Sequence, residues 1–172
     1  AVIADPTRFP FVDRVLELEE NKRVVSQCTL SEESHPFLTD HAIGGVPYHP
    51  GVMALEMFAQ NALLLSPSTC LAGFEDVAFG LPVKLVKGPM TVRVQATLER
   101  RNGDVSWMRC RLVSDLTNSK GEVFGEREHH TATVRLVDKI DDLRTFLEDE
   151  VRALPMLGIP GAGEFIHPPS FI

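Results

Sequence analysis

Residues 51–65 read GVMALEMFAQNALLL and form the most strongly helical stretch of the chain. Apolar residues fall on almost every side of the predicted helix, and only Glu56, Gln60 and Asn61 interrupt them. A helix that is apolar all round is typically buried. The Ser-Pro-Ser run at residues 66–68 ends the pattern, because proline cannot continue a helix. We therefore expect a buried helix over residues 51–65.

The segments around this helix are predicted mostly as strands. Alternating or apolar runs occur at residues 12–19, 22–30, 74–79, 84–86, 90–100, 105–114 and 122–137. Asn102-Gly103 is the strongest hairpin signal, and residues 118–121 predict another turn. A helix can be buried on all sides only if a curved sheet wraps it. The predicted class is α+β: a single hot-dog fold, with a long central helix wrapped by a curved antiparallel sheet.

The length of 172 residues suits one domain with a sizeable core. We assign this domain to residues 1–137. Residues 138–172 are expected to hold a mostly polar helix at 141–154 and a tail rich in proline and glycine.

Charge and cysteine content exclude several classes of protein. The net charge of -7 argues against binding to nucleic acid or to an anionic membrane surface. No apolar run reaches the roughly 18–20 residues that a membrane span needs. Cys28, Cys70 and Cys110 lie far apart without metal-ligand spacing, so neither a disulfide framework nor a zinc site is expected. Reduced thiols favour a cytoplasmic location.

The segment before the helix is predicted to carry the chemistry. Residues 31–50 contain three histidines, three prolines and two adjacent glycines, and long irregular loops are often functional. Within it, His41, Gly45 and Pro50 reproduce the HxxxGxxxxP signature of polyketide-synthase dehydratase domains. The preceding HPFLTD (residues 35–40) also resembles the lead-in to that signature.

The resemblance extends on both sides of this segment. Pro50-Gly51 followed by Glu56 and Gln60 resembles the PG…ExxxQ helix of stand-alone 3-hydroxyacyl-acyl carrier protein dehydratases of the hot-dog fold. Three further segments are also similar to dehydratases, in part to the dehydratase domains of the iterative synthases for enediynes and polyunsaturated fatty acids. These segments are FPFVDRVLELE (9–19), FEDVAFGLPVKL (74–85) and REHHTATVRL (127–136).

The resemblance implies an activity and its partners. It implies removal of water from a (3R)-hydroxyacyl thioester to give a trans-2-enoyl thioester in fatty-acid or polyketide synthesis. The substrate would be carried on the phosphopantetheine of an acyl carrier protein, with no metal or redox cofactor. In the family, the histidine and the acid of one site come from two hot-dog units. His41 of one chain would then face Glu56 of its partner in a homodimer.

The chemistry of the residues agrees with these roles. His41 suits the base, since an imidazole titrates near working pH. Glu56 suits the acid, because burial in an apolar helix would favour a protonated carboxyl group. The N–H of Gly51 begins the helix, where developing negative charge is stabilised, and glycine lets a thioester approach closely. Gln60 lies one turn after Glu56 and could orient it. Pro50 stands where its missing N–H costs nothing.

The predicted roles of the remaining polar residues are less specific. Tyr48 and His49 are candidate pocket residues, although Tyr48 could simply pack and a loop role is the better reading of His49. His35 is expected to shape the loop. His129 and His130 are adjacent on a predicted strand, so they should point to opposite faces and serve structural roles.

Alternatives to the dehydratase stay open. Glu56 could be a hydrogen-bonded structural carboxylate, because fused double hot-dog dehydratases take their acid from the second half. The chain could then be a non-catalytic or half-site unit of a multidomain synthase, which binds acyl groups or acts as a scaffold. A hot-dog thioesterase is the third reading, and the HxxxGxxxxP loop speaks against it.

Overall fold

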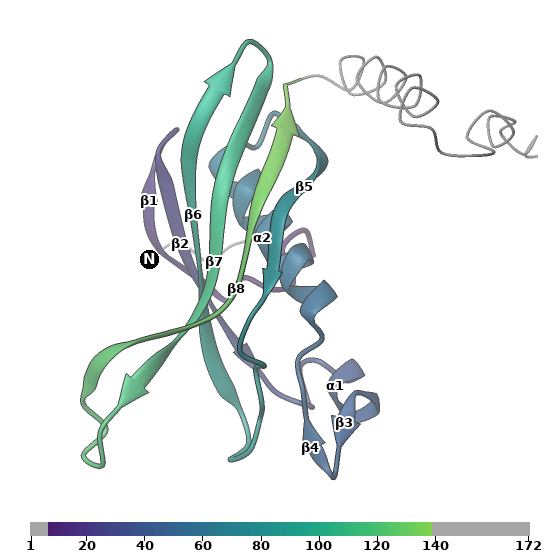
Figure 1. The fold of residues 1–172 in the computed structure, drawn as a ribbon, viewed down its shortest axis with the longest axis vertical. Helices are drawn as coiled ribbons and strands as arrows, with labels where there is room; N and C mark the ends of the chain where they lie inside the picture. Colours follow the sequence, from purple (N-terminus) through teal and green to yellow (C-terminus); the bar gives the residue numbers. More distant parts are fainter. Residues whose placement is uncertain (1–6, 139–172) are drawn as a thin grey trace, which may run out of the picture.

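The computed structural model describes residues 7–138, and its central feature is an antiparallel sheet. The strands of the sheet are β1 (Arg14–Glu19), β2 (Arg23–Leu30), β5 (Cys70–Phe79), β6 (Met90–Asn102), β7 (Val105–Thr117) and β8 (Val123–Val137). Their order is β1-β2-β6-β7-β8-β5. Figure 1 shows the strands curving together, with helix α2 (Gly51–Leu65) along one face. This arrangement is the predicted α+β hot-dog architecture.

Both predicted turns are confirmed. Asn102 pairs with Val105, so Gly103 and Asp104 form a two-residue loop between β6 and β7. Gly103 has a φ of 57°, which glycine adopts without strain at this position of a tight hairpin. The turn at residues 118–121 joins β7 to β8.

Helix α2 has the predicted bounds, and one of its faces fills the core. Ala54, Met57, Phe58, Ala62 and Leu65 are at most 3% exposed. The core cluster that contains them also includes Val94 of β6, Leu112 of β7 and Val134 of β8. Burying one large apolar side chain stabilises a fold by about 1.5–3 kcal/mol, so this face is what holds α2 to the sheet.

The expectation that α2 is buried on every side is wrong for the single chain. Val52 is 66% exposed, and Glu56, one turn further along, is also exposed. Residues four apart share a helix face, so Val52 and Glu56 mark a side of α2 that this chain's sheet does not cover. The sheet curves around only part of the helix.

The segment at residues 31–50 has more regular structure than predicted. It contains α1 (Phe37–Asp40) and a small hairpin of β3 (Ala42–Ile43) and β4 (Val46–Pro47). In contrast, the strand predicted at residues 84–86 forms only an isolated bridge, between Tyr48 and Lys84.

The predicted C-terminal helix at residues 141–154 and the tail after it lie outside the described residues. The proposed boundary between residues 137 and 138 is therefore untested. Among residues 7–138, no helix is long and apolar enough to cross a membrane.

Candidate active site

His41 is held by Tyr48 on both its backbone and its side chain. The carbonyl of His41 accepts a hydrogen bond from the backbone N–H of Tyr48 at 2.9 Å. The Nδ1 atom of His41 lies 2.8 Å from the Tyr48 carbonyl oxygen. A carbonyl oxygen only accepts, so Nδ1 carries the hydrogen and Nε2 keeps its lone pair. In the neutral form of this tautomer, the exposed imidazole therefore has its lone pair on Nε2.

Two glycines, of which Gly45 belongs to the signature, shape the turn after His41. Gly44 and Gly45 join β3 to β4 with φ values of 60° and 78°. Both lie in the left-handed region, which residues with a Cβ adopt only at a cost. Gly45 therefore serves the hairpin that returns the chain from His41 to Tyr48.

His49 lies in the core of this loop. It is 4% exposed, and its ring meets Phe11 and Phe37 edge-on with centroids 6.3 and 6.2 Å away. Neither of its ring nitrogens has a hydrogen-bond partner among the described residues. Burial, followed by the nearby histidines, His130 first, lowers the pKa of His49 to about 4. His49 is therefore neutral at physiological pH and packs as part of the loop.

Pro50 and Gly51 form the start of α2. Pro50 is the extended residue that precedes the first turn, so its missing N–H costs nothing there, as predicted. A Cβ atom on Gly51 would lie 2.7 Å from Cδ1 of Phe79. The ring of Phe79 occupies the space beside Gly51, so a larger residue here would have to displace this half-exposed side chain. The first N–H groups of a helix have no acceptor within the helix, so they can bind an oxygen that gains negative charge.

Glu56 is held by Gln60. The Nε2 atom of Gln60 donates to Oε1 of Glu56 at 2.8 Å, and Oε1 of Gln60 accepts from the backbone N–H of Phe11 at 2.9 Å. The predicted orienting role of Gln60 thus has the required geometry. The expectation that Glu56 is buried is wrong for the single chain, because its side chain lies on the uncovered face of α2. No hydrogen bond joins His41 to Glu56 within the described residues.

His129 and His130 do not point to opposite faces, which corrects the prediction. Leu112 of β7 pairs with His130 and Val113 pairs with Glu128, so His129 is the extra residue of a β-bulge. The bulge leaves the two rings with centroids 6.4 Å apart.

The structural role predicted for His129 is consistent with its bonds. Its Nδ1 atom donates to the Leu81 carbonyl at 3.0 Å, and its Nε2 atom accepts from Oγ of Ser114 at 2.8 Å. His35 is likewise buried, with its ring stacked on Phe11 at 5.2 Å. Burial lowers the pKa of His35, His129 and His130 alike.

Comparison with known proteins agrees with the motifs. The family model described as the polyketide synthase dehydratase domain matches residues 9–115, more than half of the 172 residues. The chain belongs to this dehydratase family. The 3-hydroxyacyl-(acyl-carrier-protein) dehydratase FabZ of Desulforamulus reducens is 46% identical over 110 residues, which span 58% of this chain and 74% of that protein.

Two other comparisons set the extent of the likeness. The protein of the same name from Aromatoleum aromaticum is 38% identical over 96 residues, 45% of this chain, and the match spans about three fifths of that relative, 61%. The dehydratase heterocomplex ApeI:P of Xenorhabdus doucetiae superposes with a TM-score of 0.56 at 18% identity, covering 81% of this chain and 90% of that chain. This structural likeness establishes the hot-dog fold.

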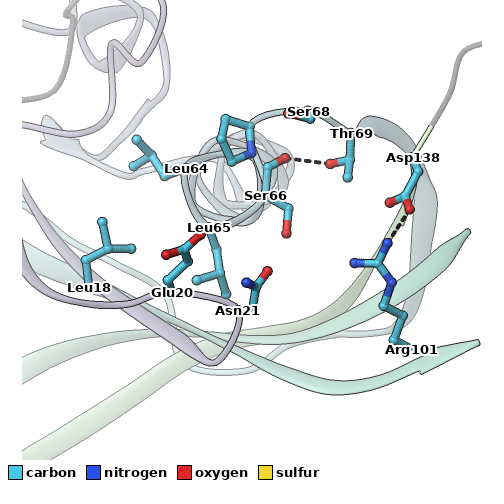
Figure 2. A pocket seen from close by; sticks show the side chains of 11 residues that line it. Leu18, Glu20, Asn21, Leu64, Leu65, Ser66, Ser68, Thr69, Arg101 and Asp138 are labelled. Carbon is cyan, nitrogen blue, oxygen red and sulfur yellow. Dashed lines mark hydrogen bonds and ion pairs between the residues drawn. The ribbon is translucent and has the colours of Figure 1, made fainter.

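Two hollows lie in this dehydratase-family chain, one at the C-terminal end of α2 and one beside the loop that follows β5. A pocket of about 560 Å³ lies at the far end of α2 from His41. There Leu65 and Ser66 face Asn21, and an ion pair joins Arg101 to Asp138 (Figure 2). A second hollow, of about 470 Å³, is lined by Leu81, Pro82, Lys84, Val86, Met90, Arg127 and His129. The second lies nearer His41, because Lys84 forms the bridge to Tyr48.

Two contacts of the site were missed by sequence reasoning. The backbone N–H of Phe11 holds Gln60, and the ring of Phe79 fills the space beside Gly51. Both residues stand in segments that the resemblance covers, but nothing in their residue types signals contact with α2. A backbone hydrogen bond in particular leaves no trace in a sequence.

Proposed function

We propose that the chain is a 3-hydroxyacyl-thioester dehydratase that acts on substrates carried by an acyl carrier protein. The observation that supports it most is the locked imidazole of His41, whose free Nε2 lies in the loop that leads into α2. Membership of the dehydratase family and the names of the FabZ relatives support the same chemistry.

The proposed reaction is an elimination with two proton transfers. Nε2 of His41 takes a proton from C2 of the acyl chain, and the electron pair of that C–H bond forms the C2–C3 double bond. The C3–O bond breaks, and the hydroxyl group leaves as water with a proton from Glu56. The N–H of Gly51 polarises the thioester carbonyl. Oxidation states balance without an external oxidant, so the chemistry needs no redox cofactor.

We propose that each site combines two chains. Glu56 and Val52 lie on the uncovered face of α2. A second copy packed against this face would desolvate Glu56 and bring it towards the other chain's His41. A homodimer would then hold two equivalent sites.

The carrier protein is proposed to dock beside the hollow near His41. Lys84, Lys87 and Arg127 are exposed there and form no ion pair with another described residue. Elsewhere in the sheet, arginines such as Arg93 and Arg111 are neutralised by carboxylates. A cationic surface on a chain of net charge -7 suits an anionic partner or a phosphopantetheine phosphate.

Mixed dimers test the proposal. His41→Ala and Glu56→Gln chains are each expected to lose about a hundredfold or more of crotonyl-thioester hydration, the reverse reaction. Refolded together in equal amounts, they should recover about a quarter of wild-type activity, because half of the dimers then contain one intact site.

Each other outcome points away from the proposal. No recovery on mixing would contradict sites shared between chains. Wild-type activity in Glu56→Gln would make Glu56 structural and favour a half-site unit. Release of free thiol from an acyl thioester would identify a thioesterase instead.

A further inference from the structure

The side-chain amide of Gln60 is held at both ends, and one end is held by the N-terminal arm (Thr7–Val12). The backbone N–H of Phe11 donates to Oε1 of Gln60 at 2.9 Å, in a buried position. The Nε2 atom of Gln60 donates to Oε1 of Glu56 at 2.8 Å. Gln60 itself is 3% exposed, and its bond to Phe11 is buried, so water does not compete for that bond.

The direction of the first bond determines the second. A glutamine amide can turn over and exchange its oxygen and nitrogen, but a backbone N–H can only donate. Phe11 therefore requires the oxygen of Gln60 on its own side, which leaves the NH₂ group facing Glu56. A donor on Oε1 of Glu56 leaves Oε2 as the oxygen that can carry a proton to a substrate.

The ring of Phe11 contacts the other half of the site. It stacks on His35 with centroids 5.2 Å apart and meets Phe37 and His49 edge-on at 6.2 and 6.3 Å. These residues flank His41 in the sequence. One residue of the arm thus contacts both the loop of the base and the partner of the acid.

We propose that Phe11 is a positioning residue, whose backbone N–H orients Gln60 and thereby presents Oε2 of Glu56 to the substrate. The inference rests on the proposed function. It assigns to the arm a role in the reaction, in addition to its packing in the core.

Two substitutions at residue 11 separate the N–H from the ring. Phe11→Pro removes both the N–H and the ring, and Phe11→Leu removes only the ring, so the difference between them reports the N–H. In Phe11→Pro we expect about tenfold faster exchange of the Gln60 side-chain amide protons, measured by NMR, and about tenfold lower kcat with KM within about twofold. In the dehydration direction, where Glu56 is the proposed proton donor, the alkaline limb of the kcat profile should also move.

Phe11→Leu is the matched control. It should lower Tm while the protection of the Gln60 amide and the alkaline limb stay as in the wild type. A folded Phe11→Pro variant with wild-type amide protection and kcat would overturn the inference. Equal losses in Phe11→Leu and Phe11→Pro would also overturn it, because the ring alone would then explain the effect.

A variant at Gln60 decides the matter if Phe11→Pro does not fold. Gln60→Glu keeps an acceptor for Phe11 but replaces the amide donor to Glu56 by a second carboxyl group, which would share a proton with Glu56. It should lower kcat and shift the alkaline limb while the Phe11 amide proton stays protected, and wild-type kinetics would overturn the inference. The NMR readouts do not depend on dehydratase activity. Failure of the proposed function would be seen as an active Glu56→Gln variant, and it can therefore be distinguished from failure of this inference.

Discussion

His49 illustrates how a single buried side chain couples the fold to pH. Its two ring nitrogens have no partner among the described residues, and its pKa is lowered from 6.5 to about 4 by burial and nearby histidines. An unpartnered buried polar group typically costs about 1–3 kcal/mol. The position therefore favours the neutral imidazole and opposes its protonation.

Acid should weaken the fold through His49. The unfolded chain binds the proton near pH 6.5 and the folded chain only near pH 4, so stability is complete above 6.5 and falls as the pH drops towards 4. At about 1.4 kcal/mol for each pH unit, the loss from this residue approaches 3 kcal/mol. Urea unfolding at pH 7.5, 5.5 and 4.5 measures it.

His49→Leu is the control for that measurement. It should be near wild-type stability at pH 7.5 and lose less stability on acidification. Parallel pH curves for the two proteins would show that His49 is not responsible.

A second prediction at this scale concerns the contact between Gly51 and Phe79. A Cβ at residue 51 would lie 2.7 Å from the Phe79 ring, which is 53% exposed and can turn aside, so we expect a cost of about 0.5–1.5 kcal/mol. Gly51→Ala should therefore destabilise the wild type but have little effect in a Phe79→Ala background. Unfolding free energies of the four proteins give the coupling, and strictly additive losses would contradict the contact.

At the scale of elements, the sequence predicts α2 residue for residue. Its nearly continuous apolar residues and the flanking prolines define the helix without tertiary information. The hairpin of β3 and β4 was missed, since its short strands are held by the turn at Gly44 and Gly45 rather than by an apolar pattern. The exposure of Glu56 was also missed. A helix that is apolar all round does not reveal which face its own sheet leaves uncovered.

The junction between β5 and the following loop provides a test at this scale. Gly80 donates its N–H to the His129 carbonyl at 2.9 Å, and a Cβ on Gly80 would lie 2.7 Å from that same oxygen. Backbone cannot move aside as a side chain can. Gly80→Ala should therefore cost about 2 kcal/mol or more in urea unfolding.

Gly125→Ala is the matched control within β8. A Cβ there would meet only Leu116 Cδ1 at 3.7 Å, which is an ordinary contact, and we expect a change within about 0.5 kcal/mol. Equal effects at residues 80 and 125 would show that the carbonyl of His129 is not the obstacle.

At the scale of the whole molecule, the uncovered face of α2 presents apolar surface that the chain's own sheet does not bury. Val52 is 66% exposed there, while Val77 and Phe79 are 40% and 53% exposed on β5, a strand at the edge of the sheet. Apolar side chains gathered around an edge strand and an open helix face are typical of an interface. Such an interface is what the proposed pairing of His41 and Glu56 requires.

Charge placed on this face should separate the chains. Val52→Asp is expected to convert a dimer to a monomer in analytical ultracentrifugation and to abolish hydration activity. The folding of each chain should be unaffected, because residue 52 is exposed. Leu18→Asp, at a 55% exposed position on the opposite edge strand β1, should stay dimeric. A dimeric Val52→Asp protein would place the interface elsewhere.

The arm around Phe11 has a consequence for such a dimer. The ring of Phe11 packs against the histidine loop of its own chain, and its N–H holds Gln60, which holds Glu56. In the proposed dimer, that Glu56 would serve the centre that contains the partner's histidine. Loss of the Phe11 N–H from a single arm would therefore slow the one centre that receives that chain's Glu56 and leave the other unchanged. A hybrid with Phe11→Pro in one chain should accordingly turn over at slightly more than half the normal rate.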